Sequence, residues 1–296
     1  MKTFLRYYLS CCALLIAAGA VAETTTFIYP RSISSVDSQY MYDYDLLRLA
    51  LEKTRAEFGH YELRHSDVGM AQARAAEEIY AGTGTVNIFA RSTSVEHEAR
   101  MLPIRIPLDK GLISYRIFLI REEDQRRFSS IRTLDDLREL SVGSYTTWAD
   151  TKILRDNGFS VVTGESYEGL FKMLIANRFD FFSRSVDEAY REYDERSEQL
   201  PTMKVEDAVL LHFPTTRYFF VQRSPAGEKL ARRVEHGLNQ MIKDGSFDIL
   251  FRKYKGPLID RAHLKTRRMF RIPNPHLPPE TPLARRELWY DPLADR

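Results

Sequence analysis

Cysteine is almost absent from this 296-residue chain, since its two cysteines, Cys11 and Cys12, both lie near the N-terminus. Residues after position 22 therefore contain no disulfide, cysteine metal site or cysteine nucleophile. The seven histidines show no spacing typical of metal ligands, and the chain has neither a phosphate-binding glycine loop nor a G-x-S-x-G motif. We therefore expect no metal, no cofactor and no catalytic residues.

Long hydrophobic runs are also lacking, with one exception near the N-terminus. Lys2 and Arg6 precede an apolar run at 9–21 that ends in small residues. This pattern is typical of a secretory signal peptide at 1–22, cleaved after Ala22. The run is short for a membrane span, although an uncleaved anchor is the alternative. Export of a body without disulfides predicts a bacterial periplasmic protein.

The chain has no excess of charge of one sign. Without Lys2 and Arg6, 41 basic residues face 41 acidic ones, so nothing indicates a nucleic-acid partner. Hydrophobic residues make up 44% of the chain, enough for two domains of ordinary size.

Short strands and amphipathic helices alternate along the chain. The pattern predicts strands at 25–29, 61–64, 86–89, 115–121, 141–142, 159–162, 179–182 and 218–222, and helices at 45–58, 70–80, 166–176, 186–196, 227–243 and 247–254. Such alternation predicts an α/β fold with mainly parallel sheets.

Residues 140–162 form the best-defined unit, a strand, a tight loop, a helix and a second strand. Ser144, Thr146 and Thr147 are predicted to cap the helix by accepting hydrogen bonds from its free N–H groups. A loop that leaves the carboxyl end of a strand and enters a helix is a common ligand site. Trp148 lies in this loop, and we interpret it as stacking on a flat ligand or as covering the wall of a cleft.

Several segments, taken in order, carry a family resemblance. They are the N-terminal leader, TLDDLRELSVGSYTTW, GLFKMLIANRFDFF, RYFFVQRSP and LNQMIKDGSFDILFRKY. Together they resemble the extracellular solute-binding proteins of family 3, which have the type II periplasmic binding fold and are associated with polar amino-acid ABC transporters. The resemblance covers roughly residues 24–256. The segments TTWADTKILRDNGF, FDFFSRS and TPLARRELWY are similar to an uncharacterised branch of this family.

The resemblance implies a two-lobed α/β protein. Each lobe would be a mostly parallel sheet flanked by helices, and two crossing strands would join the lobes. Lobe 1 would comprise residues 23–113 and 216–262, lobe 2 residues 114–215, and residues 263–296 would be an extension that packs on the surface. Ligand would bind between the lobes at the carboxyl ends of the strands, and the lobes would close by a hinge.

Two positions depart from the amino-acid-binding pattern of that family. Thr93 is followed three residues later by Glu96, where family members usually carry an arginine for the α-carboxylate of the ligand. The place of the usual aspartate for the α-amino group falls near Ser185, with Arg184 beside it. The two charge partners of a standard amino acid are therefore missing or reversed.

The candidate ligand-binding residues follow predicted strands at the edge where the resemblance places the ligand. Arg184 is interpreted as a guanidinium that grips a carboxylate or phosphate, and a surface charge or a buried ion pair is the alternative. Arg116 is placed near a crossing strand, within reach of the hinge or the ligand. The full set is Tyr29, Arg31, Tyr40, Thr93, Arg116, Ser144, Thr147, Trp148 and Arg184.

These features predict a monomeric periplasmic solute-binding protein. It would capture a small polar, carboxylate-bearing solute between two closing lobes and deliver it to an ABC permease. A binding protein that presents its liganded form to a membrane sensor is one alternative. A small periplasmic enzyme on the same scaffold is another.

Overall fold

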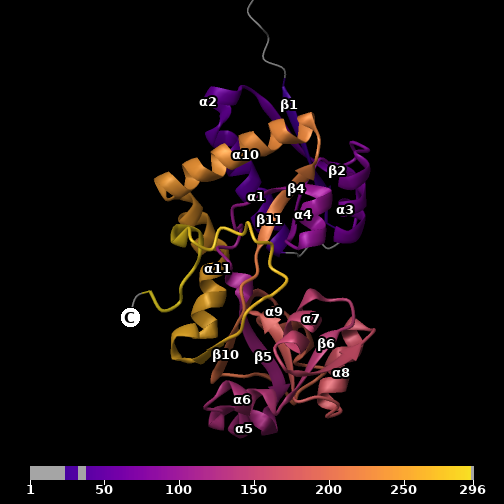
Figure 1. Cartoon of the computed structure of the whole chain (residues 1–296), viewed down its shortest axis with the longest axis vertical. Helices are drawn as coiled ribbons and strands as arrows, with labels where there is room; N and C mark the ends of the chain where they lie inside the picture. Colours follow the sequence, from indigo (N-terminus) through magenta and orange to yellow (C-terminus); the bar gives the residue numbers. More distant parts are fainter. Residues whose placement is uncertain (1–23, 33–37, 295–296) are drawn as a thin grey trace, which may run out of the picture.

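The computed structural model describes residues 24–32 and 38–294. The predicted signal peptide and its cleavage site at Ala22 lie outside the described residues. The chain forms two α/β lobes that lie one above the other along the longest axis of the molecule (Figure 1). Within the described part of the chain, no helix is both long and apolar enough to cross a membrane.

Lobe 1, the upper lobe in Figure 1, contains the first four strands and the return strand β11. Its strands are β1 (Thr25–Arg31), β2 (Tyr61–Gly69), β3 (Ile88–Ser92), β4 (Met101–Ile104) and β11 (Arg217–Gln222). Its helices are α1 (Ser38–Lys53), α2 (Arg55–Phe58), α3 (Gln72–Ala81), α4 (Val95–Arg100) and α10 (Pro225–Asp244). Asn87 links β1 to β3, because its side chain accepts a hydrogen bond from Ile28 N at 2.8 Å and its own N–H donates to Ile28 O at 3.1 Å.

Lobe 2 is built on one sheet with the strand order β12-β10-β5-β8-β6-β7, and β9 also pairs with β5. Its strands are β5 (Tyr115–Arg121), β6 (Ser141–Tyr145), β7 (Ser160–Gly164), β8 (Phe181–Ser185), β9 (Met203–Val205), β10 (Val209–His212) and β12 (Arg268–Arg271). Its helices are α5 (Gln125–Ser130), α6 (Leu134–Arg138), α7 (Ala149–Asp156), α8 (Tyr167–Ile175) and α9 (Val186–Arg196).

The sense of strand pairing follows the connections. Strands joined through an intervening helix are parallel, as β1 is to β2 and β6 is to β7 and β8. Antiparallel pairing is confined to the ladders of β5 and β11, the strands that follow the two crossings between the lobes. The two-lobed α/β fold class predicted from the sequence is thus confirmed, with crossings at residues 105–114 and 213–216.

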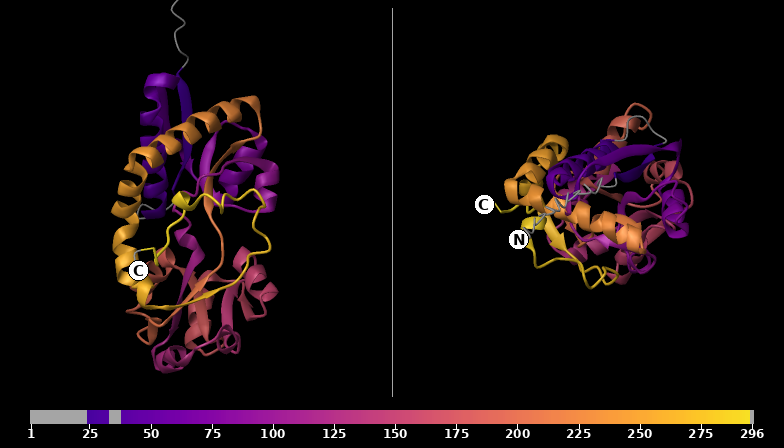
Figure 2. Two further views of the ribbon diagram at one scale, coloured as in Figure 1. Left: turned by 60° about the vertical axis from the view of Figure 1, so that its left-hand side comes forward. Right: turned by 90° about the horizontal axis from the view of Figure 1, so that it is seen from above.

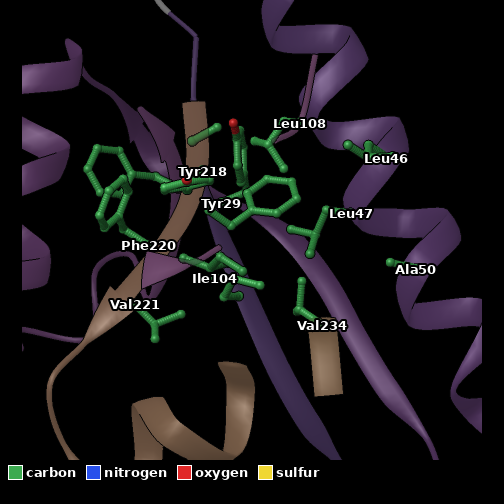
Figure 3. Packing of buried hydrophobic residues seen from close by; sticks show 14 of the residues in the cluster. Tyr29, Leu46, Leu47, Ala50, Ile104, Leu108, Tyr218, Phe220, Val221 and Val234 are labelled. Carbon is green, nitrogen blue, oxygen red and sulfur yellow. The ribbon is translucent and has the colours of Figure 1, made fainter. Parts of the chain in front are cut away.

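The core of lobe 1 forms where α1 and α10 pack on the sheet (Figure 3). Leu46, Leu47 and Ala50 of α1 are fully buried, as is Val234 of α10. Because full burial of one such aliphatic side chain typically contributes about 1.5–3 kcal/mol, this packing fixes α1 on the sheet. The start of α1 is thereby held beside the carboxyl end of β1.

Helix α11 (Ser246–Ala262) contacts both lobes. Tyr254 donates its hydroxyl to Asp45 of α1 at 2.6 Å. The next residue, Lys255, pairs with Asp187 of α9 at 2.6 Å. Beyond α11, residues for which the sequence indicated only surface packing contribute β12, which pairs in parallel with β10.

Most of the predicted helices and strands are present, with shifted ends. Helix α6 begins with a capping box, since Thr133 accepts from the N–H of Asp136 and Asp136 accepts from the N–H of Thr133. The strand predicted at 179–182 is displaced, because β8 runs from 181 to 185. This shift changes the interpretation of the residues that follow, as shown below.

Helices α1 and α10 approach each other closely at Gly237. A Cβ atom there would lie 2.1 Å from the carbonyl oxygen of Ala50, which is backbone and cannot move aside easily. We expect Gly237→Ala to lower the free energy of unfolding by about 1–3 kcal/mol, although alanine normally favours a helix. Glu235→Ala, at an exposed position of the same helix, should change it by less than about 0.5 kcal/mol. Urea unfolding of both variants measures this, and equal stabilities would contradict the packing described.

Candidate ligand-binding site

A pocket of about 230 Å³ opens at the edge of lobe 1 where β1 and β2 end. Its walls come from the end of β1, the first turns of α1 and α3, the end of β2 and the middle of β3. The residues that line it are Tyr29, Pro30, Arg31, Ser32, Tyr40, Asp43, Met70, Ala71, Gln72, Ala75, Phe89, Ala90 and Arg217. Three of the predicted site residues, Tyr29, Arg31 and Tyr40, therefore lie together in one cavity.

The rim of the pocket carries positive charge. Arg31 is exposed, and its guanidinium has no ion pair or hydrogen bond with any part of the chain that the structure describes. Helix α3 begins beside it at Gln72, its N-cap residue Ala71 provides no side-chain hydrogen bond, and its first turn has no acidic residue. The free N–H groups of this turn and Arg31 together favour an anion.

The inner walls are aromatic and rigid. Tyr29 is buried in the lobe 1 core, and its ring centre lies 5.4 Å from that of Tyr40. The Tyr40 hydroxyl donates to Pro30 O at 2.5 Å and lies 2.7 Å from His65 Nδ1. Burial and the nearby Asp43 carboxylate raise the pKa of Tyr29, so its hydroxyl stays neutral.

The floor of the pocket is a buried ion pair. Arg217, the first residue of β11, donates through both terminal nitrogens to the carboxylate of Asp43 in α1, at 2.7 and 3.3 Å. Burial disfavours the charged guanidinium, but Asp43 more than offsets this and the pKa of Arg217 is raised. Because these two charges cancel, Arg31 supplies the net charge of the pocket lining.

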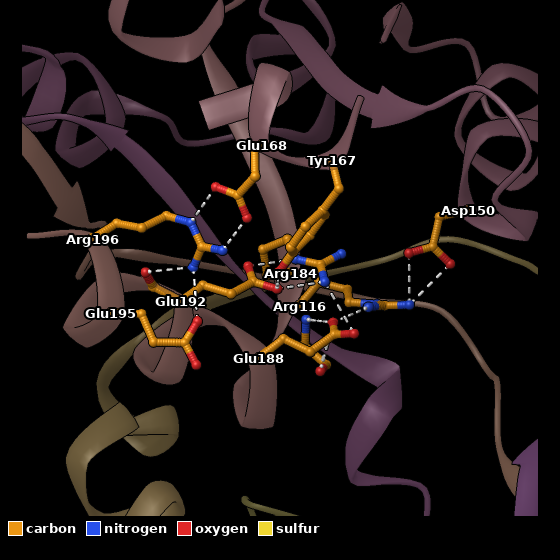
Figure 4. A network of polar contacts seen from close by, with 10 residues as sticks. Arg116, Asp150, Tyr167, Glu168, Arg184, Glu188, Glu192, Glu195 and Arg196 are labelled. Carbon is orange, nitrogen blue, oxygen red and sulfur yellow. Dashed lines mark hydrogen bonds and ion pairs between the residues drawn. The ribbon is translucent and has the colours of Figure 1, made fainter. Parts of the chain in front are cut away.

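Arg184 lies on lobe 2 in a network of ion pairs (Figure 4). It is 4% exposed and binds Glu192 through Nε and Nη2, at 2.8 and 2.7 Å. A further contact of 3.1 Å joins it to Glu188. This geometry favours the alternative given above, a buried ion pair, over a guanidinium that faces the ligand. The physical reason is that β8 continues to Ser185, so Arg184 is part of the sheet instead of the loop after it.

Arg116 belongs to the same network and is also buried. Its Nη2 lies 2.8 Å from Asp150 of α7, and its Nη1 lies 3.6 Å from Glu188 of α9. Burial opposes ionisation of Glu188, but the neighbouring Arg184 and Arg116 prevail and lower its pKa to about 2. Two guanidinium groups therefore face three carboxylates, those of Asp150, Glu188 and Glu192, so both positive charges are compensated within the network.

The other predicted site residues of lobe 2 surround this network. Ser144 is buried and hydrogen-bonded to Thr151 at 2.6 Å, whereas Thr147 is exposed. The half-buried Trp148 ring stacks on Phe182 with a centre-to-centre distance of 6.0 Å, so its packing role is clear. The predicted capping of α7 by Ser144, Thr146 and Thr147 is wrong, because Trp148 is the N-cap residue and no side chain caps the helix.

Thr93, in lobe 1, is also engaged internally. Its hydroxyl donates to Glu98 at 2.6 Å, and the same carboxylate receives two hydrogen bonds from Arg105, at 3.1 and 2.6 Å. Thr93 is not among the residues that line the pocket.

The sequence analysis did not identify the residues that form the floor of the pocket or those that form its wall after β2. Arg217 had a detectable signal, because it is a charged residue that opens an otherwise apolar strand. Asp43 lies between two tyrosines in α1, which is a weaker signal, and Met70, Ala71 and Gln72 gave none. Among the described residues, no cluster of three or more potential ligands could hold a metal ion.

Comparisons with known proteins place the chain by its fold. No family model and no curated protein matches its sequence. Among solved structures, it is similar to an ancestral arginine-binding protein bound to glutamine, with a TM-score of 0.53, 14% identity, and coverage of 78% of this chain and 98% of the other. The same ancestral protein bound to arginine gives a TM-score of 0.51, with 14% identity and coverage of 78% and 97%.

An amino acid ABC transporter substrate-binding protein from Streptococcus pneumoniae, bound to L-arginine, also matches, with a TM-score of 0.51 and 11% identity over 78% of this chain and 94% of the other. The chain has the fold of the two-lobed periplasmic binding proteins. At these identities the likeness concerns the fold alone. The pocket lies at the edge of lobe 1 where β1 and β2 end, and its lining comes from lobe 1 alone.

We expect the buried ion pair between Arg184 and Glu192 to stabilise the folded protein. Arg184→Ala leaves Glu192 buried without its partner, which typically costs about 3–5 kcal/mol. Arg127→Ala removes a half-exposed pair with Asp180 and should cost less than about 1 kcal/mol. Denaturant unfolding of both variants, without any ligand, gives the two values. A small effect of Arg184→Ala would restore its role as a ligand group.

Asp109, in the first crossing, gives the fold a pH dependence. Burial, only partly opposed by Arg217, raises its pKa to about 6. The folded state therefore holds this proton at pH values where the unfolded chain has released it, so the contribution of Asp109 to stability falls as pH rises from about 4 to about 6. We expect Asp109→Asn to flatten the decline in unfolding free energy over this range, and Asp207→Asn, at an exposed position, to leave it unchanged. Parallel slopes in all three proteins would show that Asp109 ionises normally.

Proposed function

We propose that this protein is a periplasmic solute-binding protein and not an enzyme, and that it captures a small carboxylate-bearing solute between its lobes. The observation that carries the proposal is the lobe 1 pocket, in which Arg31, without an ion pair among the described residues, adjoins the uncapped first turn of α3. A guanidinium and free backbone N–H groups that converge on one rim match the two oxygens of a carboxylate.

The pocket dimensions support a small ligand. A volume of about 230 Å³ is below the 300–1,000 Å³ common for drug-sized ligands, so lobe 1 encloses only a small solute or one end of a larger one. The walls of Tyr29, Tyr40 and Phe89 suit an apolar or flat body next to the carboxylate. Lobe 2 would cover the remainder when the lobes close.

The cellular role follows from this proposal. The leader at residues 1–22 would direct the protein to the periplasm, where it would act as a monomer. Delivery of the solute to an ABC permease is the proposed outcome, supported by the similarity in fold to the pneumococcal transporter component.

Native mass spectrometry of freshly purified protein identifies the retained solute, and calorimetric titration then measures its affinity. A charge-assisted hydrogen bond is worth roughly 1.5–3 kcal/mol, so Arg31→Ala should weaken binding by roughly tenfold to a hundredfold or more. Arg31→Lys should restore part of the affinity, since lysine keeps the charge but loses the planar fork.

Arg55→Ala provides the matched control, because Arg55 is an exposed arginine on α2 that does not line the pocket. It should bind as the wild type does. Unchanged affinity in Arg31→Ala would remove the pocket from the proposal, and turnover of the solute during titration would indicate an enzyme instead.

A further inference from the structure

The polypeptide after α11 is anchored first on lobe 2. After β12, Ile272 is buried in the lobe 2 core and donates its N–H to His212 O at 2.9 Å. The side chain of Asn157 donates to Pro273 O at 2.9 Å. His276 then contacts Asp156, at the end of α7, at 2.5 Å.

The same polypeptide is anchored a second time on lobe 1. Leu288 is 2% exposed and belongs to the lobe 1 core, and Trp289 packs against that core. The Trp289 ring covers Gly111 so closely that a Cβ atom there would lie 2.3 Å from it. Tyr290 donates its N–H to Lys110 O at 2.7 Å, at the first crossing.

Between the two sets of anchors the connection is short. Thr281, which is 8% exposed, lies beside Tyr218 of lobe 1 and follows the lobe 2 anchor His276 by five residues, and five residues span at most about 18 Å. Pro278 and Pro279 lie within this span, and Thr281 donates its N–H to Pro278 O at 3.0 Å, which closes a turn. The connection can therefore lengthen only as far as this turn unfolds.

The path of this segment places it opposite α11. In both Figure 1 and the left view of Figure 2, the yellow chain leaves the lower end of α11, crosses lobe 2, turns upward on the side away from α11 and returns across lobe 1. The crossing strands thus have α11 on one side and this segment on the other. Asn274 also donates to Pro214 O of the second crossing at 2.8 Å.

We propose that residues 273–290 form an interlobe strap that holds the two lobes near one separation and limits how far the cleft between them opens. A protein whose lobes open freely spends part of its time in conformations that cannot bind the ligand. Its apparent affinity is then the intrinsic affinity multiplied by the fraction of molecules in the binding-competent conformation. The strap reduces that loss, because its buried anchors on both lobes and its short proline-rich span resist widening.

Lengthening the strap without removing its anchors tests the proposal. Six Gly/Ser residues inserted after Leu277, between the two sets of anchors, would give the strap slack. The same six residues inserted after Leu283 provide the control, because that exposed position lies between Thr281, beside Tyr218 of β11, and Leu288, in the lobe 1 core. Small-angle scattering of each ligand-free protein, with a thermal melt, gives the comparison.

The insertion after Leu277 should increase the radius of gyration and the maximum dimension, while the control insertion should leave both at their wild-type values. Equal dimensions in all three folded proteins would overturn the proposal. If the first insertion prevents folding, Trp289→Ala takes its place, because it weakens the lobe 1 anchor and should produce the same expansion. Wild-type dimensions in folded Trp289→Ala would also overturn the proposal. These readouts use no ligand, so they stand apart from a failure of the proposed solute binding.

Discussion

The bidentate pair between Arg217 and Asp43 is the interaction on which the arrangement of lobe 1 depends. Arg217 is the first residue after the second crossing, and Asp43 lies in the first half of α1. Their contact ties the crossing strand to the helix whose start borders the pocket. Because a buried charge without its partner is very costly, the pair fixes where β11 begins relative to α1. The end of the second crossing and the floor of the pocket are therefore held by the same ion pair.

Lobe 2 follows the same principle with more charges. Arg116 and Arg184 are buried at the ends of paired strands, and carboxylates from α7 and α9 neutralise both. The network locks the first turns of these helices onto the sheet. Arg116 and Arg184 are thus compensated within lobe 2, whereas the Arg31 guanidinium of lobe 1 has no ion pair among the described residues.

The sequence allowed the fold to be predicted but only part of the site. The hydrophobic pattern of the sequence predicted both ends of β5 and both ends of α9 correctly. The end of β8 was misplaced because its last three residues, Ser183, Arg184 and Ser185, are polar and follow an aromatic run. This pattern resembles a loop after a strand. In the sheet, Arg184 and Ser185 bind the carboxylates of Glu192 and Glu188 in α9, the helix that follows β8 directly. These pairings depend on where β8 ends, which the sequence pattern did not show.

The strap shows the same limit for the C-terminal extension. A strand of four residues rich in arginine followed by prolines gives no periodic pattern, and β12 forms because β10 offers a free edge in lobe 2. Buried residues anchor this segment on both lobes, Ile272 in the core of lobe 2 and Leu288 in the core of lobe 1. The two lobes are thus joined in three ways, by the crossing strands, by α11 and by the C-terminal segment, and each of these contacts depends on side chains that no periodic pattern marks.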